Sequence, residues 1–406
     1  MIRSAPARQD AMRRHNLALV LQQIHLDGAL TRAELTQRLG LSRSTIGDLV
    51  AELSTLGLLG ESVPSGGPRV GRPSHVVGPR PHSPFVVAVD IDVNRIVAAA
   101  IGVGGRVLAR QVLTTRPGPA SPEEVTQEIA EAVPALQETV GGGASPVGVG
   151  ISVPGTVDRL TYVVGLAPNL GWHDAAFGEL VQKAIPQLPV SIGNDADLAV
   201  LAEHSRGSAR GYDDVIYLLG RVGVGAGILV DGRPLRGAGG LAGEVGHTIL
   251  DPAGPLCHCG AQGCVEMFVG DAALLRLAGS ESDPEADVQV VLKAAADGEQ
   301  SALKAVQSLA ESLGFAVANM VNLLNPRLVV MGGSLENVLI LAQVQVEAAL
   351  DQHAMAAARS MVELRTSGLG EDGSLLGAAE LAFGPLMADP LSTLAALRVP
   401  AGASSG

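Results

Sequence analysis

The chain has 406 residues, of which 47% are hydrophobic and only 2% aromatic, so it is long enough for two or three domains with largely aliphatic cores. No apolar run approaches the ~18 residues of a membrane helix and the start lacks a signal peptide's apolar stretch, so we expect a cytoplasmic protein with no membrane segment. Residues 1–80 carry ten Arg and six acidic residues, a net of +4, whereas the total charge is −13. A basic head on an acidic body predicts that the head meets a polyanion.

Residues 1–80 have the pattern of a winged helix-turn-helix. Apolar residues from Leu17 to Ile24 recur at helical spacing and predict a first amphipathic helix. Thr31 and Glu34 form a capping box that opens a second helix, and a Gly-Leu pair supplies the turn that follows it. Ser42 caps a third helix, whose inward-facing residues are Ile46, Leu49, Val50 and Leu53.

The third helix is the expected reader of the DNA major groove, since its first turn offers an arginine and short polar side chains to base edges and phosphates. A Pro/Gly-rich tip at 64–68 and two arginines after it predict a β-wing. The candidate DNA-contacting residues are Thr31, Ser42, Arg43, Ser44, Thr45, Arg69 and Arg72. The alternative is a small three-helix module that binds another kind of partner.

From Pro84 onward, short strands alternate with helices, which predicts a three-layer α/β body. The expected strands are 85–90, 95–101, 106–114, 147–152, 190–192, 215–219, 225–230 and 327–331. The expected helices are 122–139, 288–296, 302–323 and 375–383. We expect the Pro- and Gly-punctuated residues after them to be frayed or disordered.

All three cysteines lie within eight residues, as Cys257-x-Cys259-x4-Cys264. Three thiolates with one imidazole form the closed tetrahedral set of a structural zinc site. A disulfide is disfavoured, because neighbours two apart bridge only with strain and the odd count leaves one thiol over. Inert buried cysteines are the plainer alternative. The pattern alone leaves the fourth ligand open between His247 and His258.

Five motifs in order give the chain a resemblance to the ROK family, which groups sugar-responsive repressors with sugar kinases on an actin-like, two-lobed fold. The motifs are Gly150-Ile151-Ser152-Val153-Pro154-Gly155-Thr156-Val157-Asp158, Pro168-Asn169-Leu170-Gly171-Trp172, Asn194-Asp195-Ala196, Gly243-Glu244-Val245-Gly246-His247 and Cys257 to Glu266. They spread over residues 85–385, and the winged head that precedes them resembles the family's repressor branch.

The resemblance implies a structural zinc ion held by His247, Cys257, Cys259 and Cys264. It also implies a sugar site between the lobes, formed by Asn169, Asn194, Asp195, Glu244, His247 and Glu266. Sugar hydroxyls both donate and accept hydrogen bonds, so converging amides and carboxylates suit them. With His247 in both sets, the metal would hold the acids of this wall in place. Trp172 is expected to border the same site.

The residues leave two functions open, a ligand-gated repressor and an ATP-dependent sugar kinase. In the family's kinases, the position of Asp195 acts as general base. The first phosphate loop of those kinases has the pattern Asp-x-Gly-x-Thr. At the glycine and threonine positions this chain has Asp92 and Asn94. The second phosphate loop of those kinases has the pattern Gly-Thr-Gly, and this chain has Arg221-Val222-Gly223 there. A carboxylate facing ATP phosphates repels them, so we expect a sugar sensor without catalysis.

The expected organisation is a winged helix-turn-helix (1–80), a first actin-like (ribonuclease-H-like) α/β lobe (81–198) completed by a helix near 372–385, a second α/β lobe with the zinc site (199–371), and a flexible tail (386–406). The expected partners are double-stranded operator DNA and a sugar or sugar phosphate. A homodimer or homotetramer would present paired heads to a palindromic operator.

Overall fold

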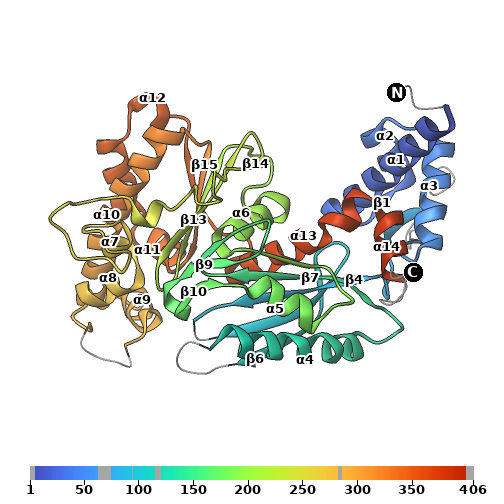
Figure 1. The fold of residues 1–406 in the computed structure, drawn as a ribbon. Coiled ribbons are helices and arrows are strands. Elements are labelled where there is room, and N and C mark those ends of the chain that lie inside the picture. Colours follow the sequence, from blue (N-terminus) through green and yellow to red (C-terminus); the bar gives the residue numbers. More distant parts are fainter. Residues whose placement is uncertain (1–4, 63–74, 94, 115–119, 282–285, 399–406) are drawn as a thin grey trace.

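The computed structural model describes residues 5–62, 75–93, 95–114, 120–281 and 286–398, and in it a small head meets a two-lobed body (Figure 1). The head consists of α1 (Ala5–Asp27), α2 (Arg32–Leu39), α3 (Arg43–Thr55) and a three-stranded antiparallel sheet, β1 (Leu30–Thr31), β3 (Val76–Pro79) and β2 (Leu59–Ser62), in that order. The predicted winged helix-turn-helix is therefore confirmed. The expected wing tip, with Arg69 and Arg72, lies outside the described residues.

The predicted caps set the helices of the head. The hydroxyl of Thr31 accepts a hydrogen bond from the backbone N–H of Glu34, and the Glu34 carboxylate accepts one from the N–H of Thr31. Ser42 Oγ accepts from the N–H of Thr45 at the start of α3. These bonds satisfy N–H groups that a helix start leaves without partners. The four apolar residues of α3 named above are buried, as expected.

The first lobe is built on a five-stranded sheet in the order β11-β7-β4-β5-β6. Its strands are β4 (Phe85–Ile91), β5 (Ile96–Gly102), β6 (Arg106–Thr114), β7 (Pro146–Val153) and β11 (Val190–Asn194). Alternate residues of a strand face opposite ways. Val87 and Val89 therefore join a core with α4 (Pro122–Val140), while Val86 and Ala88 join one with α13 (Gly373–Ala388).

Smaller elements complete the first lobe. A three-stranded sheet lies beside the large one, in the order β10-β9-β8. Its bounds, and those of the helices next to it, are β8 (Thr156–Val157), β9 (Val164–Ala167), η1 (Pro168–Leu170), β10 (Trp172–Ala175) and α5 (Phe177–Ala184).

The second lobe is built on a sheet in the order β14-β13-β12-β15-β16. Its strands are β12 (Val215–Gly220), β13 (Val224–Val230), β14 (Arg233–Pro234), β15 (Leu328–Gly333) and β16 (Glu363–Thr366). Its helices are η2 (Val245–His247), α7 (Glu266–Val269), α8 (Asp271–Leu277), α9 (Val288–Ala296), α10 (Gln300–Leu324), α11 (Ser334–His353), α12 (Ala356–Arg359) and η3 (Gly370–Asp372). One face of the sheet packs on α10 and α11, and the other packs on α6 (Asp195–Arg206).

Helices α6 and α13 lie between the two sheets and pack against each other. A side chain at Gly377 of α13 would come within 2.0 Å of the backbone oxygen of Leu198, and one at Gly227 of β13 within 2.2 Å of that of Ala196. Only glycine permits such close approach. The expected boundary between the lobes at residue 198 falls inside α6, which is one continuous helix.

The expectation of a flexible tail from residue 386 is wrong for residues 386–398. Helix α13 continues to Ala388, and α14 (Pro390–Arg398) follows it and packs against α1 and α13. Leu386, Met387 and Leu394 are buried in the same apolar core as the head. Pro385 and Pro390 looked like helix breakers, but Pro390 stands at a helix start, where its missing N–H costs nothing. No helix in the described ranges is long and apolar enough to cross a membrane.

Candidate functional site

The three cysteines and His247 meet in the second lobe. His247 ends η2, and the loop of Cys257, Cys259 and Cys264 folds back beside it, with Ile249 bridged to Cys264. The potential ligand atoms of these four residues all lie within 4.8 Å of one another. Cys257 and Cys264 are buried. The described chain thus holds a Cys3His cluster that could bind a metal ion.

The spacing of the cluster fits a tetrahedral ion. Cys259 Sγ and Cys264 Sγ are 3.6 Å apart, and Cys257 Sγ is 3.7 Å from His247 Nδ1. Ligands about 2.3 Å from a tetrahedral ion are separated by roughly 3.7 Å, whereas the sulfur atoms of a disulfide lie ~2.05 Å apart. Three thiols and an imidazole are also the donor set that zinc prefers. Between the two histidines that the sequence left open, the structure brings His247 to the thiols, while His258 is exposed.

Two acids adjoin this cluster. Glu266 begins α7, and its Oε1 accepts a hydrogen bond from the Cys257 thiol at 2.7 Å and lies 3.6 Å from His247 Nδ1. Glu244 lies just before η2. Burial raises the pKa of Glu244, and the charge of Glu266 raises it further, while His247 lowers it. The structure therefore brings Glu244, His247 and Glu266 together.

Asn194 and Asp195 lie at the start of α6. The Oδ1 atom of Asn194 accepts hydrogen bonds from the N–H groups of Ala196 and Asp197, and its Nδ2 donates one to the carbonyl of Gly155. Asn194 is thus the N-cap of α6, and one of its two amide hydrogens is left for another partner. Asp195 is buried and accepts a hydrogen bond from the N–H of Ala196.

Arg221, which follows β12, extends from the second lobe to three carboxylates. Its Nη2 donates to Asp90 at 3.1 Å, and its Nη1 lies 3.7 Å from Asp92 and 3.8 Å from Asp195. Three atoms in this cluster are buried without a hydrogen-bond partner within the described chain: Asp90 Oδ1, Ser152 Oγ and Arg221 Nη1. Such atoms are costly to leave unpaired and are common where a ligand or water binds.

This crowding shifts the titration of the carboxylates. Burial, opposed in part by Arg221 and helped by Asp90, raises the pKa of Asp195 to about 6. Burial also raises the pKa of Asp90. Burial lowers the pKa of Arg221, but the charges of Asp90, Asp195 and Asp92 have the larger effect and raise this pKa overall. We expected Asp92 to face phosphates as an uncompensated charge; instead Arg221 partly neutralises it and is itself occupied.

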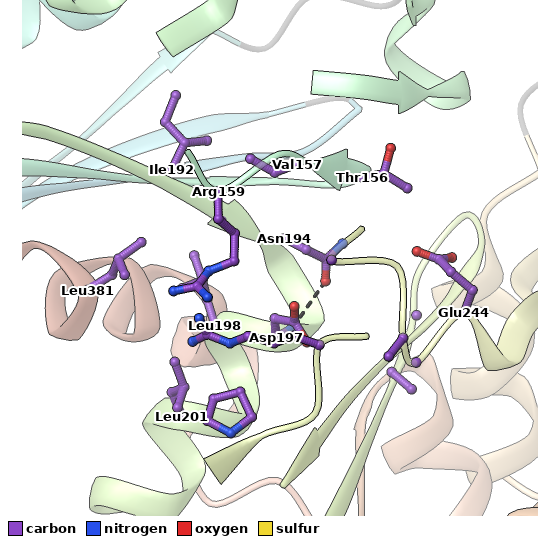
Figure 2. A pocket seen from close by; sticks show the side chains of 18 residues that line it. Thr156, Val157, Arg159, Ile192, Asn194, Asp197, Leu198, Leu201, Glu244 and Leu381 are labelled. Carbon is purple, nitrogen blue, oxygen red and sulfur yellow. Dashed lines mark hydrogen bonds between the residues drawn. The ribbon is translucent and has the colours of Figure 1, made fainter. Parts of the chain in front are cut away.

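A pocket lies between the lobes at the start of α6, and Figure 2 shows Asn194 and Glu244 on its wall. Its lining also includes Asp197, Arg159, Arg236 and Leu381. Burial raises the pKa of Asp197 to about 7, with Asp195 and Glu244 adding to the shift. These lining residues and the pairing of Arg221 were missed from sequence, since neither periodicity nor motif spacing marks them. Only the charge of Arg221 in a phosphate-loop position offered a signal.

Of the sugar-site candidates, Asn194 and Glu244 line the interlobe pocket, whereas Asn169, Asp195, His247 and Glu266 are not among its lining residues, nor is Trp172. Asn169 is half-buried on η1 and makes no hydrogen bond to the other five candidates within the described chain. Trp172 does not border the pocket, because its ring is 97% buried in the core of the first lobe and packs on Phe177. Its indole N–H donates to the carbonyl of Ala120.

On the head, Arg43 and Ser44 are exposed at the first turn of α3. Thr31 is less available for contact with DNA, since its hydroxyl donates to the Glu34 carboxylate and accepts from the Glu34 N–H. Ser42 and Thr45 share a contact between their side-chain oxygens. Ser44 Oγ also lies 2.8 Å from Ser42 Oγ, so Arg43 is the side chain of this exposed turn that stands outside the hydrogen bonds of the cap.

Comparison with known proteins agrees with the motifs. The pattern of the ROK family matches residues 86–384, which is most of the chain. This chain belongs to the ROK family. Among curated relatives, the xylose repressor of Caldicellulosiruptor bescii is 30% identical over 333 residues, covering 78% of this chain and 82% of that protein.

Two solved structures show the same fold. A ROK family transcriptional regulator, a homologue of the E. coli MLC protein, superposes with a TM-score of 0.77 at 24% identity, covering 94% of this chain and 99% of that one. A ROK family glucokinase from Streptomyces griseus, in complex with glucose and AMPPNP, gives a TM-score of 0.64 at 29% identity, covering 74% and 99%. The two-lobed, actin-like body is thus shared with regulators and kinases, and only the regulator's match extends over nearly the whole chain.

Proposed function

We propose that this ROK protein is a sugar-responsive transcriptional repressor, which binds operator DNA through its winged head and a sugar or sugar phosphate between its lobes. The observation that carries the proposal is the joining of an exposed Arg43-Ser44 turn to a body whose interlobe pocket is lined by Asn194, Asp197 and Glu244. Repressors among its relatives support the same function. Such a protein acts on DNA in the cytoplasm, and a homodimer or homotetramer would match a palindromic operator.

We further propose that the Cys3His cluster holds a structural zinc ion. The ion would need the imidazole as a neutral ligand through Nδ1, the nitrogen nearest Cys257. That arrangement leaves Nε2 of His247 to meet a sugar hydroxyl, beside the carboxylates of Glu244 and Glu266. Because metal ligands are fixed in orientation, zinc would preorganise this wall of the sugar site.

The proposal includes no catalysis, although one observation favours a sugar kinase as the second candidate. A carboxylate with a pKa near 6, as Asp195 has, is suited to accept a proton from a hydroxyl. Against this stands Arg221, which holds Asp195, Asp90 and Asp92 from the position of the second phosphate loop. ATP with its metal ion would have to break these contacts, so we expect binding of sugar without transfer of phosphate.

DNA binding is tested by selecting duplexes from a random pool with the whole protein and measuring their affinity with and without D-xylose and D-glucose. Replacing Arg43 with Ala should weaken binding by about 1–3 kcal/mol, roughly 5- to 150-fold, and leave sugar affinity unchanged. Arg110→Ala removes the same charge from the body, where Arg110 pairs with Asp372. It should leave DNA affinity as it is; equal losses in both variants would contradict the assignment of α3.

Phosphotransfer is tested directly with ATP, D-glucose and D-xylose. Turnover near ~1 s⁻¹, in the range of ordinary enzymes, would overturn the sensor and support the kinase. If activity is found, Asp195→Asn should abolish it. Activity that survives in this variant would assign it to a contaminating kinase.

The metal is tested by replacing Cys259 with Ser and measuring zinc content and sugar affinity in the purified protein. Loss of zinc should weaken sugar binding by about 10- to 100-fold, as when supports of a metal site are removed. Affinity for the selected DNA in the absence of sugar should stay within about twofold. A variant that keeps both zinc and sugar affinity would sink the proposed role of the cluster.

A further inference from the structure

Three polar side chains from distant parts of the chain meet at the far end of α6, away from the sugar site. Arg206, the last residue of α6, donates through Nε to Glu380 of α13 at 2.7 Å. It also donates to the backbone carbonyls of His25 and Gly104, each at 3.0 Å. His25 belongs to α1 of the head, and its Nε2 lies 3.0 Å from Glu380. Head, α6 and α13 therefore share one set of hydrogen bonds.

The protonation of this set follows from its geometry. The backbone N–H of Gly104 donates to His25 Nδ1, which must therefore carry a lone pair. The ring proton is then on Nε2 and is donated to Glu380 at 3.0 Å, so Arg206 Nη2, 2.7 Å from the same nitrogen, does not donate to it, and Arg206 holds α1 through the carbonyl of His25. His25 is 2% exposed, and the side chains of Arg206 and Glu380 are 12% and 16% exposed. Buried and fully engaged charges of this kind hold parts together in one geometry.

Helix α6 connects this set directly to the sugar site. Its N-cap is Asn194, which lines the interlobe pocket, and its last residue is Arg206. Twelve helical residues make a rod of roughly 18 Å. The rod lies between the lobes: it continues directly from β11 of the first sheet, and it packs on α13 on one side and on β12 and β13 of the second sheet on the other. Arg206 and Glu380 thus join the ends of the two helices that lie between the lobes.

The head has other attachments, which lead to α13, to α14 and to the turn after β5, where the N–H of Gly104 donates to His25. Gln22 donates to the carbonyl of Met387, and Arg14 pairs with Asp389 at 3.1 Å. The apolar core of the head is also continuous with residues of α13 and α14. Within the described chain, Arg206 links α1 to α6. Arg210, which follows α6, pairs with Asp27 at the end of α1.

We propose that Arg206, His25 and Glu380 form a joint through which α6 transmits the state of the interlobe cleft to the DNA-binding head. When a ligand in the pocket shifts the start of α6, the helix carries Arg206 with it, and the bond to the His25 carbonyl repositions α1. The role in a sugar response rests on the proposed function. The mechanical link between the two ends of α6 does not rest on the proposed function, and it can be tested without ligand or DNA.

The first experiment measures amide hydrogen exchange by mass spectrometry on the whole, zinc-loaded protein. Asn194→Ala removes the cap at the cleft end of α6 and should speed exchange in α1 by about threefold or more. The double variant Arg206→Met with Glu380→Gln removes both charges of the joint and keeps an acceptor for His25. When Asn194→Ala is added to this double variant, the rate of amide exchange in α1 should not change. The first turn of α6 should still respond there.

The matched control is the background Arg14→Met with Asp389→Asn, which breaks a different pair between the head and the body. There the effect of Asn194→Ala on α1 should persist. An equal effect in all three backgrounds, or none in the otherwise natural protein, overturns the joint. If the double variant does not fold, Arg206→Lys replaces it; Lys reaches fewer acceptors, so the response of α1 should be reduced at least twofold.

The second experiment compares affinity for the selected duplex with and without D-xylose or D-glucose. Coupling between two sites typically changes affinity about 5- to 150-fold, and the joint variant should reduce this change to less than about twofold while its sugar affinity is retained. A full response in the variant overturns the joint. A natural protein with no sugar response refutes the proposed function, and the exchange experiment then decides on the joint alone.

Discussion

The two ends of helix α6 hold the same chemical groups in opposite conditions. At the cleft end, Arg221 faces three carboxylates, and one buried atom each of Asp90, Ser152 and Arg221 has no hydrogen-bond partner among the described residues. At the head end, Arg206 faces the carboxylate of Glu380 and also bonds two backbone carbonyls. The cleft is therefore an incompletely satisfied polar site, and the other end is a closed one.

The pKa values reflect this difference. At the cleft, burial dominates and raises the pKa of Asp195 to about 6. At the head end, burial opposes the charge of Glu380 as well, but His25 and Arg206 outweigh it and lower its pKa. An excess of carboxylates favours ligand binding or protonation, whereas a matched pair stabilises one arrangement. The cleft end of α6 is therefore suited to respond to a ligand, and the head end is suited to keep one fixed geometry.

The largest expected effect comes from breaking the closed end. Glu380→Ala leaves Arg206 buried without a counter-charge, which should lower the free energy of unfolding by about 3–5 kcal/mol. Urea unfolding followed by circular dichroism measures it. The control is Glu371→Ala at the exposed pair with Arg95, where at most about 1 kcal/mol is expected. Equal losses in the two variants would mean that the head end is no more closed than the surface.

Much of this architecture could be predicted from sequence, because its signals are local. Thr31 and Ser42 were identified as caps from neighbours three residues away, and the strands of the first sheet followed from short apolar runs. The Cys3His cluster was predictable since three of its ligands lie within one loop. Asn194 and Glu244 came from motifs of the ROK resemblance, and the pocket does contain both.

What sequence could not predict depends on contacts between distant segments. Arg206, Glu380 and His25 are separated by more than 170 residues in the chain, and no pattern links them. The order of residues 386–398 likewise comes from packing on α1 and α13, which outweighs the cost of Pro385 inside α13. Trp172 stood in a motif beside the site, yet its side chain turns into the core, because motif membership fixes a position along the chain and not a direction.

The difference between the two ends also predicts a pH dependence. The pKa of Asp195 is raised from 3.8 to about 6 in the folded chain, so the folded state binds this proton more tightly than the unfolded state. Asp195 therefore costs stability as pH rises from about 4 through about 6. Asp195→Asn removes this cost, and its stability relative to the natural protein should rise by about 3 kcal/mol across that window. A constant difference from pH 4 to pH 7 would show that Asp195 is not destabilised by burial.

The smallest effect separates the two tasks of Asn194 at the cleft end. Loss of the cap in Asn194→Ala should cost about 1 kcal/mol of stability. In Asn194→Ser the hydroxyl can still accept from the first N–H groups of α6, so stability should stay within about 0.5 kcal/mol of the natural protein. The second amide hydrogen of Asn194, which makes no hydrogen bond among the described residues, is lost in both variants, so both should bind sugar more weakly, as calorimetry would measure. If Asn194→Ser keeps full sugar affinity, Asn194 serves α6 alone, and the wall of the sugar site begins at Asp195 and Glu244.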